Sequence, residues 1–155
     1  MAIVTKDYSQ LGPTMKEVKD VTLKWLLLAR REVVVDLVTD LTRNTPVDTS
    51  QALSNWEVKR DSTFSFGSAH VKGSKGSTRE ASIALTRAAA RRESDKIPLN
   101  ATIFIGNAAP YIRRLDQGYS KQRPGPWIER TAHKSVAKSS KKYAKELAIS
   151  LDRIK

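Results

Sequence analysis

Over the first third of the chain, apolar residues recur with the period of a helix. They return at intervals of three or four from Val18 through Trp25 to Leu41, and residues 14–43 contain neither glycine nor proline. This pattern predicts one long helix over residues 14–43, with Pro13 in its first turn. About 30 residues with a rise of 1.5 Å each span roughly 45 Å, more than the core of a small domain needs. We therefore expect part of this helix to contact another subunit.

The pattern changes at residues 44–46 (Asn-Thr-Pro), where the helix should end because a residue before proline is disfavoured in the helical region. Asp48 and Gln51 have the spacing of a capping box, which predicts a short helical turn through Leu53. Apolar and polar residues then alternate over residues 56–66. That alternation predicts a strand or a hairpin, half exposed to solvent.

Residues 67–78 (GSAHVKGSKGST) are rich in glycine, serine and lysine, which predicts a flexible loop. Residues 79–94 combine alanine and other small residues with arginine, which predicts a helix suited to close packing. A strand is expected over residues 101–105, because β-branched and aromatic residues there precede the turn pair Gly106-Asn107.

Two further helices are expected near the C-terminus. Tyr111 begins a short stretch with helical spacing, which Gly118 stops. Residues 127–154 carry apolar side chains, Val136 among them, on one side and lysines on the other. They predict a basic amphipathic helix. The sequence leaves open whether this helix is continuous or interrupted near Ser139-Ser140.

Together these elements predict an α+β fold. The long N-terminal helix and the basic C-terminal helix should pack on a small, mainly antiparallel sheet, with the loop over residues 67–78 mobile. A length of 155 residues suits a single domain over residues 1–155, in which residues 1–12 form an N-terminal arm.

The net charge of +12 comes entirely from the second half of the chain. Residues 1–68 hold nine basic and nine acidic residues, whereas residues 69–155 hold nineteen basic and seven acidic ones. This asymmetry favours an anionic partner, either nucleic acid or an acidic protein surface, although a solvated basic face that maintains solubility explains it equally well. The candidate contacts are Lys72, Lys75, Lys121, Arg123, Lys138, Lys141 and Lys142.

The sequence contains no recognisable catalytic set. It has no cysteine, and His70 and His133 are far apart in the chain, so we expect neither a metal site nor a cofactor. No nucleophile-elbow pattern occurs, and Asp116 is expected to have a structural role through Arg113 at i−3. We expect no enzymatic activity. No stretch has the length and apolarity of a membrane helix and the N-terminus lacks a signal-peptide pattern, so a soluble protein made in the cytoplasm is expected.

Short motifs in two segments, some fifty residues apart, resemble a known family. The motif residues are Thr45, Pro46, Asp48, Thr49, Leu53, Trp56, Gly106, Asn107, Tyr111, Asp116, Gly118, Pro126 and Trp127. Their order resembles the minor tail-component family of tailed bacteriophages, the neck or tail-completion proteins. Two departures occur: Ser50 stands where the family commonly has glycine, and Asp116 stands where glutamate is more usual.

The resemblance implies a structural virion protein at the junction of phage head and tail, assembled in the host cytoplasm. It implies an α+β subunit in a ring, with six copies as the family expectation, that joins the connector to the tail terminator or tail tube. The basic half would then face acidic neighbouring rings or the packaged DNA. The alternative reading is a basic nucleic-acid-binding module that uses the lysine-rich last helix.

Overall fold

The computed structural model describes residues 11–46, 51–61 and 78–153. Their elements, in chain order, are α1 (Leu11–Asn44), α2 (Gln51–Ser54), β1 (Trp56–Lys59), α3 (Arg79–Lys96), β2 (Phe104–Asn107), α4 (Ile112–Asp116) and α5 (Ile128–Asp152). The fold class is α+β, as predicted. The predictions for residues 1–10, for residues 62–66 of the expected strand or hairpin, and for the loop over residues 67–77 lie outside the described residues.

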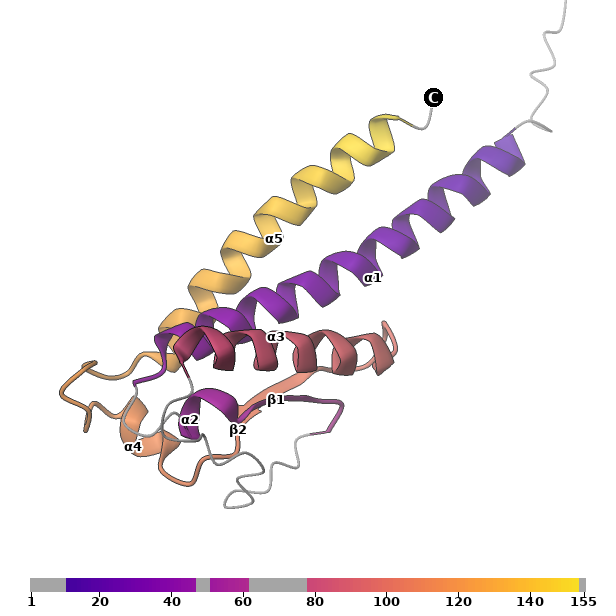
Figure 1. Ribbon diagram of the computed structural model, residues 1–155. Helices are drawn as coiled ribbons and strands as arrows, with labels where there is room; N and C mark the ends of the chain where they lie inside the picture. The colour runs from indigo at the N-terminus through magenta and orange to yellow at the C-terminus, as the bar shows by residue number, and fades with distance from the viewer. Residues whose placement is uncertain (1–10, 47–50, 62–77, 154–155) are drawn as a thin grey trace, which may run out of the picture.

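Helix α1 is the central element of the described structure. Helices α3 and α5 both run antiparallel to it, while α2, α4 and the sheet gather around its C-terminal end (Figure 1). The N-terminal half of α1 and the C-terminal half of α5 extend away from the sheet and diverge (Figure 1). Helix α1 begins at Leu11, so the end of the predicted N-terminal arm is helical instead.

Helix α3 packs on α1 through small side chains. Its buried residues are Ser82, Thr86, Ala90 and Ser94, one helical turn apart. The Thr86 hydroxyl lies 3.1 Å from that of Thr42 and also donates to the Ser82 carbonyl, so burial leaves it hydrogen-bonded. Leu85, by contrast, is 63% exposed. The prediction of close packing is confirmed, but the apolar side of the helix is not the side that packs.

Helix α5 also packs mainly through small polar side chains. Its buried residues are Thr131, Ser135, Ser139 and Tyr143. The helix is continuous, and the interruption near Ser139-Ser140 does not occur, because the Ser139 hydroxyl points inward and donates to a carboxylate oxygen of Asp36 on α1 at 2.7 Å. Val136, which the pattern places on the inner side, is exposed.

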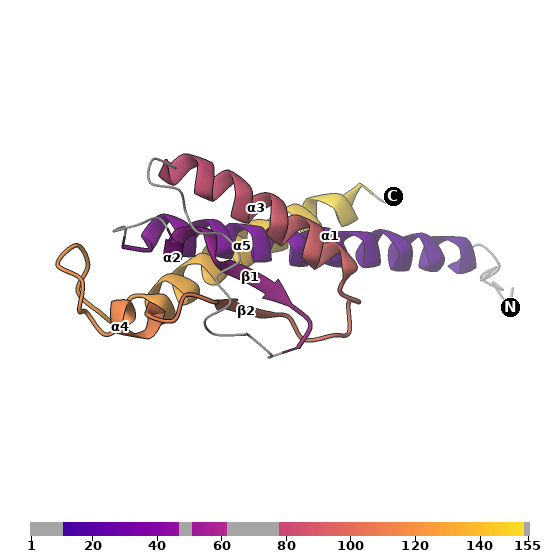
Figure 2. The same ribbon diagram turned by 60° about the horizontal axis from the view of Figure 1, so that its bottom comes forward.

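The two strands form an antiparallel pair in which Trp56 faces Asn107 and Val58 faces Ile105. The sheet lies beside α3 (Figure 2). The sequence predicts a turn at Gly106-Asn107, but both residues belong to β2 and the chain turns after them. The Asn107 amide explains the difference, since it donates to the Ala52 carbonyl at 2.6 Å and accepts from the Ala109 N–H at 2.9 Å.

The hydrophobic core lies where α1 meets the sheet. It contains Val35, Val38 and Leu41 of α1, together with Trp56 and Trp127. The buried side chains of α1 among residues 15–44 therefore all lie in its C-terminal half. None of the described helices combines the length and the apolar character that crossing a bilayer requires.

Candidate functional site

Several of the described motif residues converge on one buried cluster at the C-terminal end of α1. The indole N–H of Trp56 donates to the Thr45 hydroxyl at 3.0 Å, and that hydroxyl donates to the Leu41 carbonyl at 2.8 Å. The Trp56 and Trp127 rings meet edge to face, with centroids 6.3 Å apart. The motif cluster thus joins the end of α1, the start of β1 and the start of α5.

Asp116 connects α4 to α5. Its Oδ1 accepts the backbone N–H groups of Trp127 and Ile128, each at 2.8 Å, which are unsatisfied donors of the first turn of α5. The indole of Trp127 donates in return to the Leu115 carbonyl at 3.3 Å. Asp116 therefore has a structural role, as predicted, but it acts as a cap of α5, whereas the sequence predicted Arg113 as its partner.

Two glycines allow the α4–α5 connection to fold back on itself. Gly118 has a φ of 91°, which side chains disfavour, and it stops α4 as predicted. A Cβ on Gly125 would lie 1.8 Å from the Asp116 carbonyl oxygen, so no side chain fits there. The Gly125–Pro126 peptide bond is cis.

The remaining motif residues fall into three groups. Leu53 and Pro46 are buried, and Tyr111 packs against the core. Gly106 lies in β2 and Pro126 is exposed. Asp48 and Thr49 are outside the described residues. Since these residues mainly shape the interior, the motif cluster stabilises the fold rather than presenting chemistry to a ligand.

Among the described residues, no group of three His, Cys, Asp or Glu could hold a metal ion. The basic candidate residues fall into two places. Arg123 lies in the loop before α5, where its guanidinium donates to the Asn44 carbonyl at 3.4 Å, and Lys121 is exposed in the same loop. Lys138, Lys141 and Lys142 are exposed along α5. Lys72 and Lys75 lie outside the described part of the chain.

Lys142 and Tyr143 form a pair whose pKa values both depart from their ordinary values. The Lys142 ammonium donates to the Tyr143 hydroxyl at 3.5 Å and lies 4.9 Å from the ring centroid. Burial raises the pKa of Tyr143 above its ordinary value, and the carboxylate of Asp36 adds to the rise. The hydrogen bond from Lys142 to Tyr143 in turn raises the pKa of the lysine.

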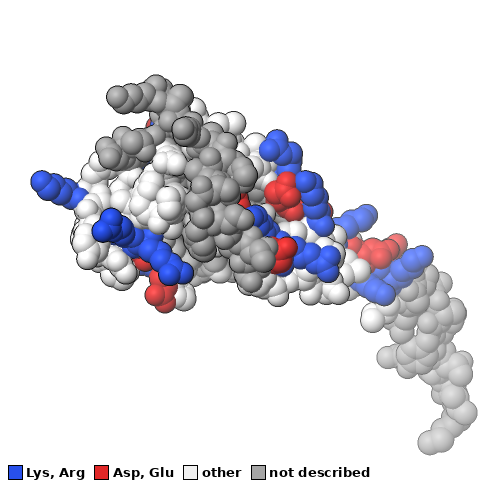
Figure 3. Space-filling model, turned by 90° about the horizontal axis from the view of Figure 1, so that it is seen from below, with Lys and Arg blue, Asp and Glu red and all other residues white. Residues whose placement is uncertain are grey.

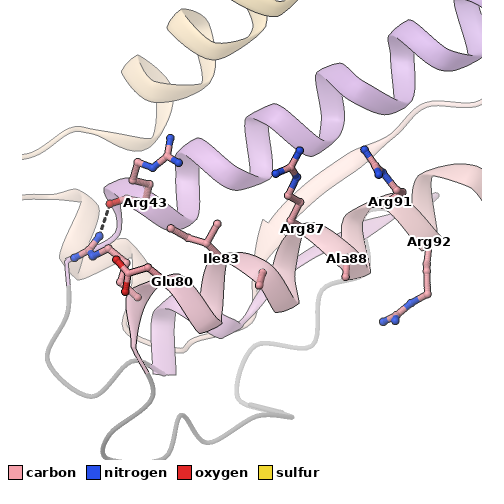
Figure 4. Close-up of a pocket in the computed structure, with 9 residues that line it drawn as sticks. Arg43, Glu80, Ile83, Arg87, Ala88, Arg91 and Arg92 are labelled. Atoms are coloured by element: carbon pink, nitrogen blue, oxygen red, sulfur yellow. Dashed lines mark hydrogen bonds between the residues drawn. The ribbon is translucent and has the colours of Figure 1, made fainter.

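Sequence reasoning missed one surface, which we call the arginine groove. It has a volume of about 880 Å³ and is lined by Arg43, Arg79, Glu80, Ile83, Ala84, Arg87, Ala88, Arg91 and Arg92. Arg87 and Arg91 rise side by side from α3, whereas Arg92 points to the other side (Figure 4). The signal in the sequence is the spacing of four residues between Ala84, Ala88 and Arg92 and between Ile83, Arg87 and Arg91.

Comparisons with models of protein families, with curated proteins and with solved structures found no match to this chain. The resemblance to phage tail-completion proteins therefore depends on the motif residues alone.

Proposed function

We propose that the chain is a structural protein of the phage head–tail interface, a neck or tail-completion subunit whose ring joins the connector to the tail. The observation that carries this proposal is the projecting N-terminal half of α1. It leaves Met15, Leu23, Leu26, Leu27 and Leu28 between 40% and 67% exposed. Large apolar side chains grouped on one exposed helix are typical of an interface.

The position of these leucines supports association through α1. Arg30 donates to the carbonyls of Ile97 and Pro98 at the end of α3, and α1 continues beyond that point (Figure 1). Lysines and acidic residues alternate on the projecting part of α1 (Figure 3), so its net charge is small. Apolar contact is therefore the main attraction that this part of α1 offers to a partner.

A ring needs two different complementary surfaces on each subunit. An apolar cleft of about 370 Å³ lies between α1 and α5, with Trp25, Leu26 and Leu147 in its lining. Helical geometry places Leu27 and Leu28 on faces of α1 that point away from this cleft. The projecting half of α1 thus offers apolar surface in two directions, which suits a contact that repeats around a ring.

Removal of the gene from the phage that carries it tests the proposal. We expect DNA-filled heads and separate tails, visible by electron microscopy, that join when the purified protein is added. A variant with Leu23→Glu and Leu27→Glu should fail to restore joining. The matched control is Leu85→Glu, which changes an exposed leucine on α3 and should restore it. Normal joining in the absence of the protein would refute the proposal.

A second candidate function, nucleic-acid binding, is favoured by one observation. Lys134, Lys138, Lys141 and Lys145 are all exposed and follow one face of α5 at intervals of four, three and four residues. They form a lysine stripe about 16 Å long. Such a stripe can neutralise successive phosphates of a nucleic acid backbone.

Binding of duplex DNA, measured at two salt concentrations, tests this candidate. If the lysine stripe binds DNA, Lys134→Glu with Lys141→Glu should lower the affinity and reduce the slope of log K against log salt by about 2 or more. Arg87→Glu with Arg92→Glu on α3 is the control of equal charge change and should have a smaller effect. Equal effects of the two variants would mean that only net charge matters.

A further inference from the structure

The arginine groove combines an apolar floor with a basic rim. Ala84 and Ala88 lie one turn apart on its floor, and Ile83 lies beside them. Arg87 and Arg91 stand on the side of α1 and Arg92 on the opposite side (Figure 4). Small side chains on the floor let another backbone approach closely, whereas the arginines on both sides select for negative charge.

Three of the arginines have partners within the fold, and the first of them, Arg43, pairs with the Asp40 carboxylate at 3.4 Å. Arg91 donates to both carboxylate oxygens of Glu32 at 2.9 and 3.0 Å, and Arg79 donates to the backbone carbonyls of Arg43 and Thr45. The remaining cations are freer. Arg87 and Arg92 are exposed and form no ion pair within the residues that the structure describes.

We infer that the arginine groove binds an acidic amphipathic helix of a protein partner. The partner would place small or apolar residues on the floor and carboxylates on both flanks, where guanidinium groups can pair with them in a bidentate manner. From Ile83 to Arg92 the groove runs about 14 Å along α3, which matches roughly two and a half turns of a partner helix. This inference goes beyond the proposed function and does not depend on it.

The groove fits a protein helix better than a nucleic acid. A phosphate backbone gains nothing from the apolar floor, whereas the apolar face of a partner helix can bury surface there. Among the described residues, the lining contains no aromatic side chain on which a base could stack. The lysine stripe of α5, by contrast, has the character of a phosphate contact, so the two basic surfaces should differ in what they bind.

The experiment uses the full chain and a labelled synthetic helix of about 20 residues as the probe, with fluorescence anisotropy as the readout. In this peptide Ala and Leu follow one face and Glu flanks them on both sides. A scrambled peptide has the same composition and charge but no apolar face. We expect the amphipathic peptide to bind at least about tenfold more tightly than the scrambled one, because only it uses the groove floor.

Two charge-reversal variants locate the contact. Arg87→Glu with Arg92→Glu should weaken binding of the amphipathic peptide by about tenfold or more, while Lys134→Glu with Lys141→Glu, an equal change of charge on α5, should weaken it by less than about threefold. All four residues are exposed, and circular dichroism checks that both variants fold. A floor variant, Ala88→Gln, should weaken binding of the amphipathic peptide but not binding of the scrambled peptide.

Several results would overturn the inference. One is absence of peptide binding by the unaltered chain, and another is equal affinity for the two peptides. A third is an equal loss of affinity for the amphipathic peptide in the two charge-reversal variants, which would indicate attraction by net charge. If duplex DNA competes with the peptide and Arg87→Glu with Arg92→Glu abolishes DNA binding while Lys134→Glu with Lys141→Glu does not, the groove is a nucleic-acid site instead. None of these results bears on head–tail joining, which has its own test.

Discussion

Asp116 has the most clearly defined structural role of the side chains in the motif cluster. One of its carboxylate oxygens accepts two N–H groups at the start of α5. Asp116→Ala should lower the free energy of unfolding by about 1–2 kcal/mol, because both donors lose their partner, and Asp116→Asn should lower it less, since an acceptor oxygen remains. Urea denaturation followed by circular dichroism measures the change.

The control for Asp116 is Asp152→Ala, which removes an exposed carboxylate at the other end of α5. It should change stability by less than about 0.5 kcal/mol. Equal losses at the two positions would show that net charge, rather than the cap, accounts for the effect. In that case Asp116 would have no special place in the cluster.

The raised pKa of Tyr143 leads to a prediction of how stability depends on pH. Burial raises its pKa above the ordinary value of 10.0, so the unfolded chain releases this proton at a lower pH than the folded chain does. The stabilisation is complete below about pH 10 and declines as the pH rises through the higher pKa of the folded state. Urea denaturation at about pH 8 and about pH 11 should therefore show a smaller alkaline loss for Tyr143→Phe than for the unaltered chain.

Tyr119→Phe provides the comparison for Tyr143, because Tyr119 is 77% exposed. It should lose as much stability at alkaline pH as the unaltered chain. An alkaline loss that Tyr143→Phe leaves unchanged would assign the effect to other groups. The lysines, whose ordinary pKa is also alkaline, would be the first to consider.

At the scale of elements, helix packing depends on small residues. Ala90 lies in the buried stripe of α3 and is 2% exposed. Ala90→Leu should lower the free energy of unfolding by about 1–3 kcal/mol, because the larger side chain forces α3 away from α1. Ala81→Leu adds the same atoms to an exposed position of α3 and should be near neutral. A thermal or urea denaturation series compares the two, and similar losses would contradict close packing at Ala90.

The sequence predicted the elements better than their contacts. Residues 14–43 gave a clear helical period, and Gly118 marked the end of α4, because both signals are local. The buried faces of α3 and α5 were missed, because the hydroxyls of residues such as Thr86 and Ser139 look solvent-facing in a hydropathy pattern. Their hydrogen bonds within the helix or to another helix become visible only in three dimensions.

The candidate surfaces, like the buried helix faces, depend on contacts that the sequence alone does not reveal. The motif residues could be picked out along the chain, but the contact between Trp56 and Trp127 joins positions far apart in sequence. Arg87 and Arg92 read as part of a solvated helix face, the usual role of arginine on a surface helix. That Arg43 at the end of α1 joins the arginines of α3 in one groove is visible only in three dimensions.

At the scale of the whole molecule, the elements divide into a packed body and a projecting part. Side chains of α1, α2, α3, α4 and β1 are buried in the core, whereas α1 and α5 diverge beyond it (Figure 1). Trp25 still connects the two helices there, since its indole donates to the Ser150 hydroxyl at 2.8 Å and its ring lies 6.4 Å from that of Tyr143. The leucines beside Trp25 stay exposed, which leaves apolar area uncovered on this part of α1.

This division predicts how the chain associates. If the projecting half of α1 drives association, the mass measured by sedimentation should rise with protein concentration, and Leu23→Glu with Leu27→Glu should keep the chain monomeric without loss of helix content. Raising the ionic strength from about 0.1 M to about 1 M shortens the Debye length from about 10 Å to about 3 Å, which weakens contacts between charges but not contacts between apolar surfaces. Association that persists at high salt therefore indicates the leucines of α1, whereas association that disappears indicates the basic faces of α3 and α5.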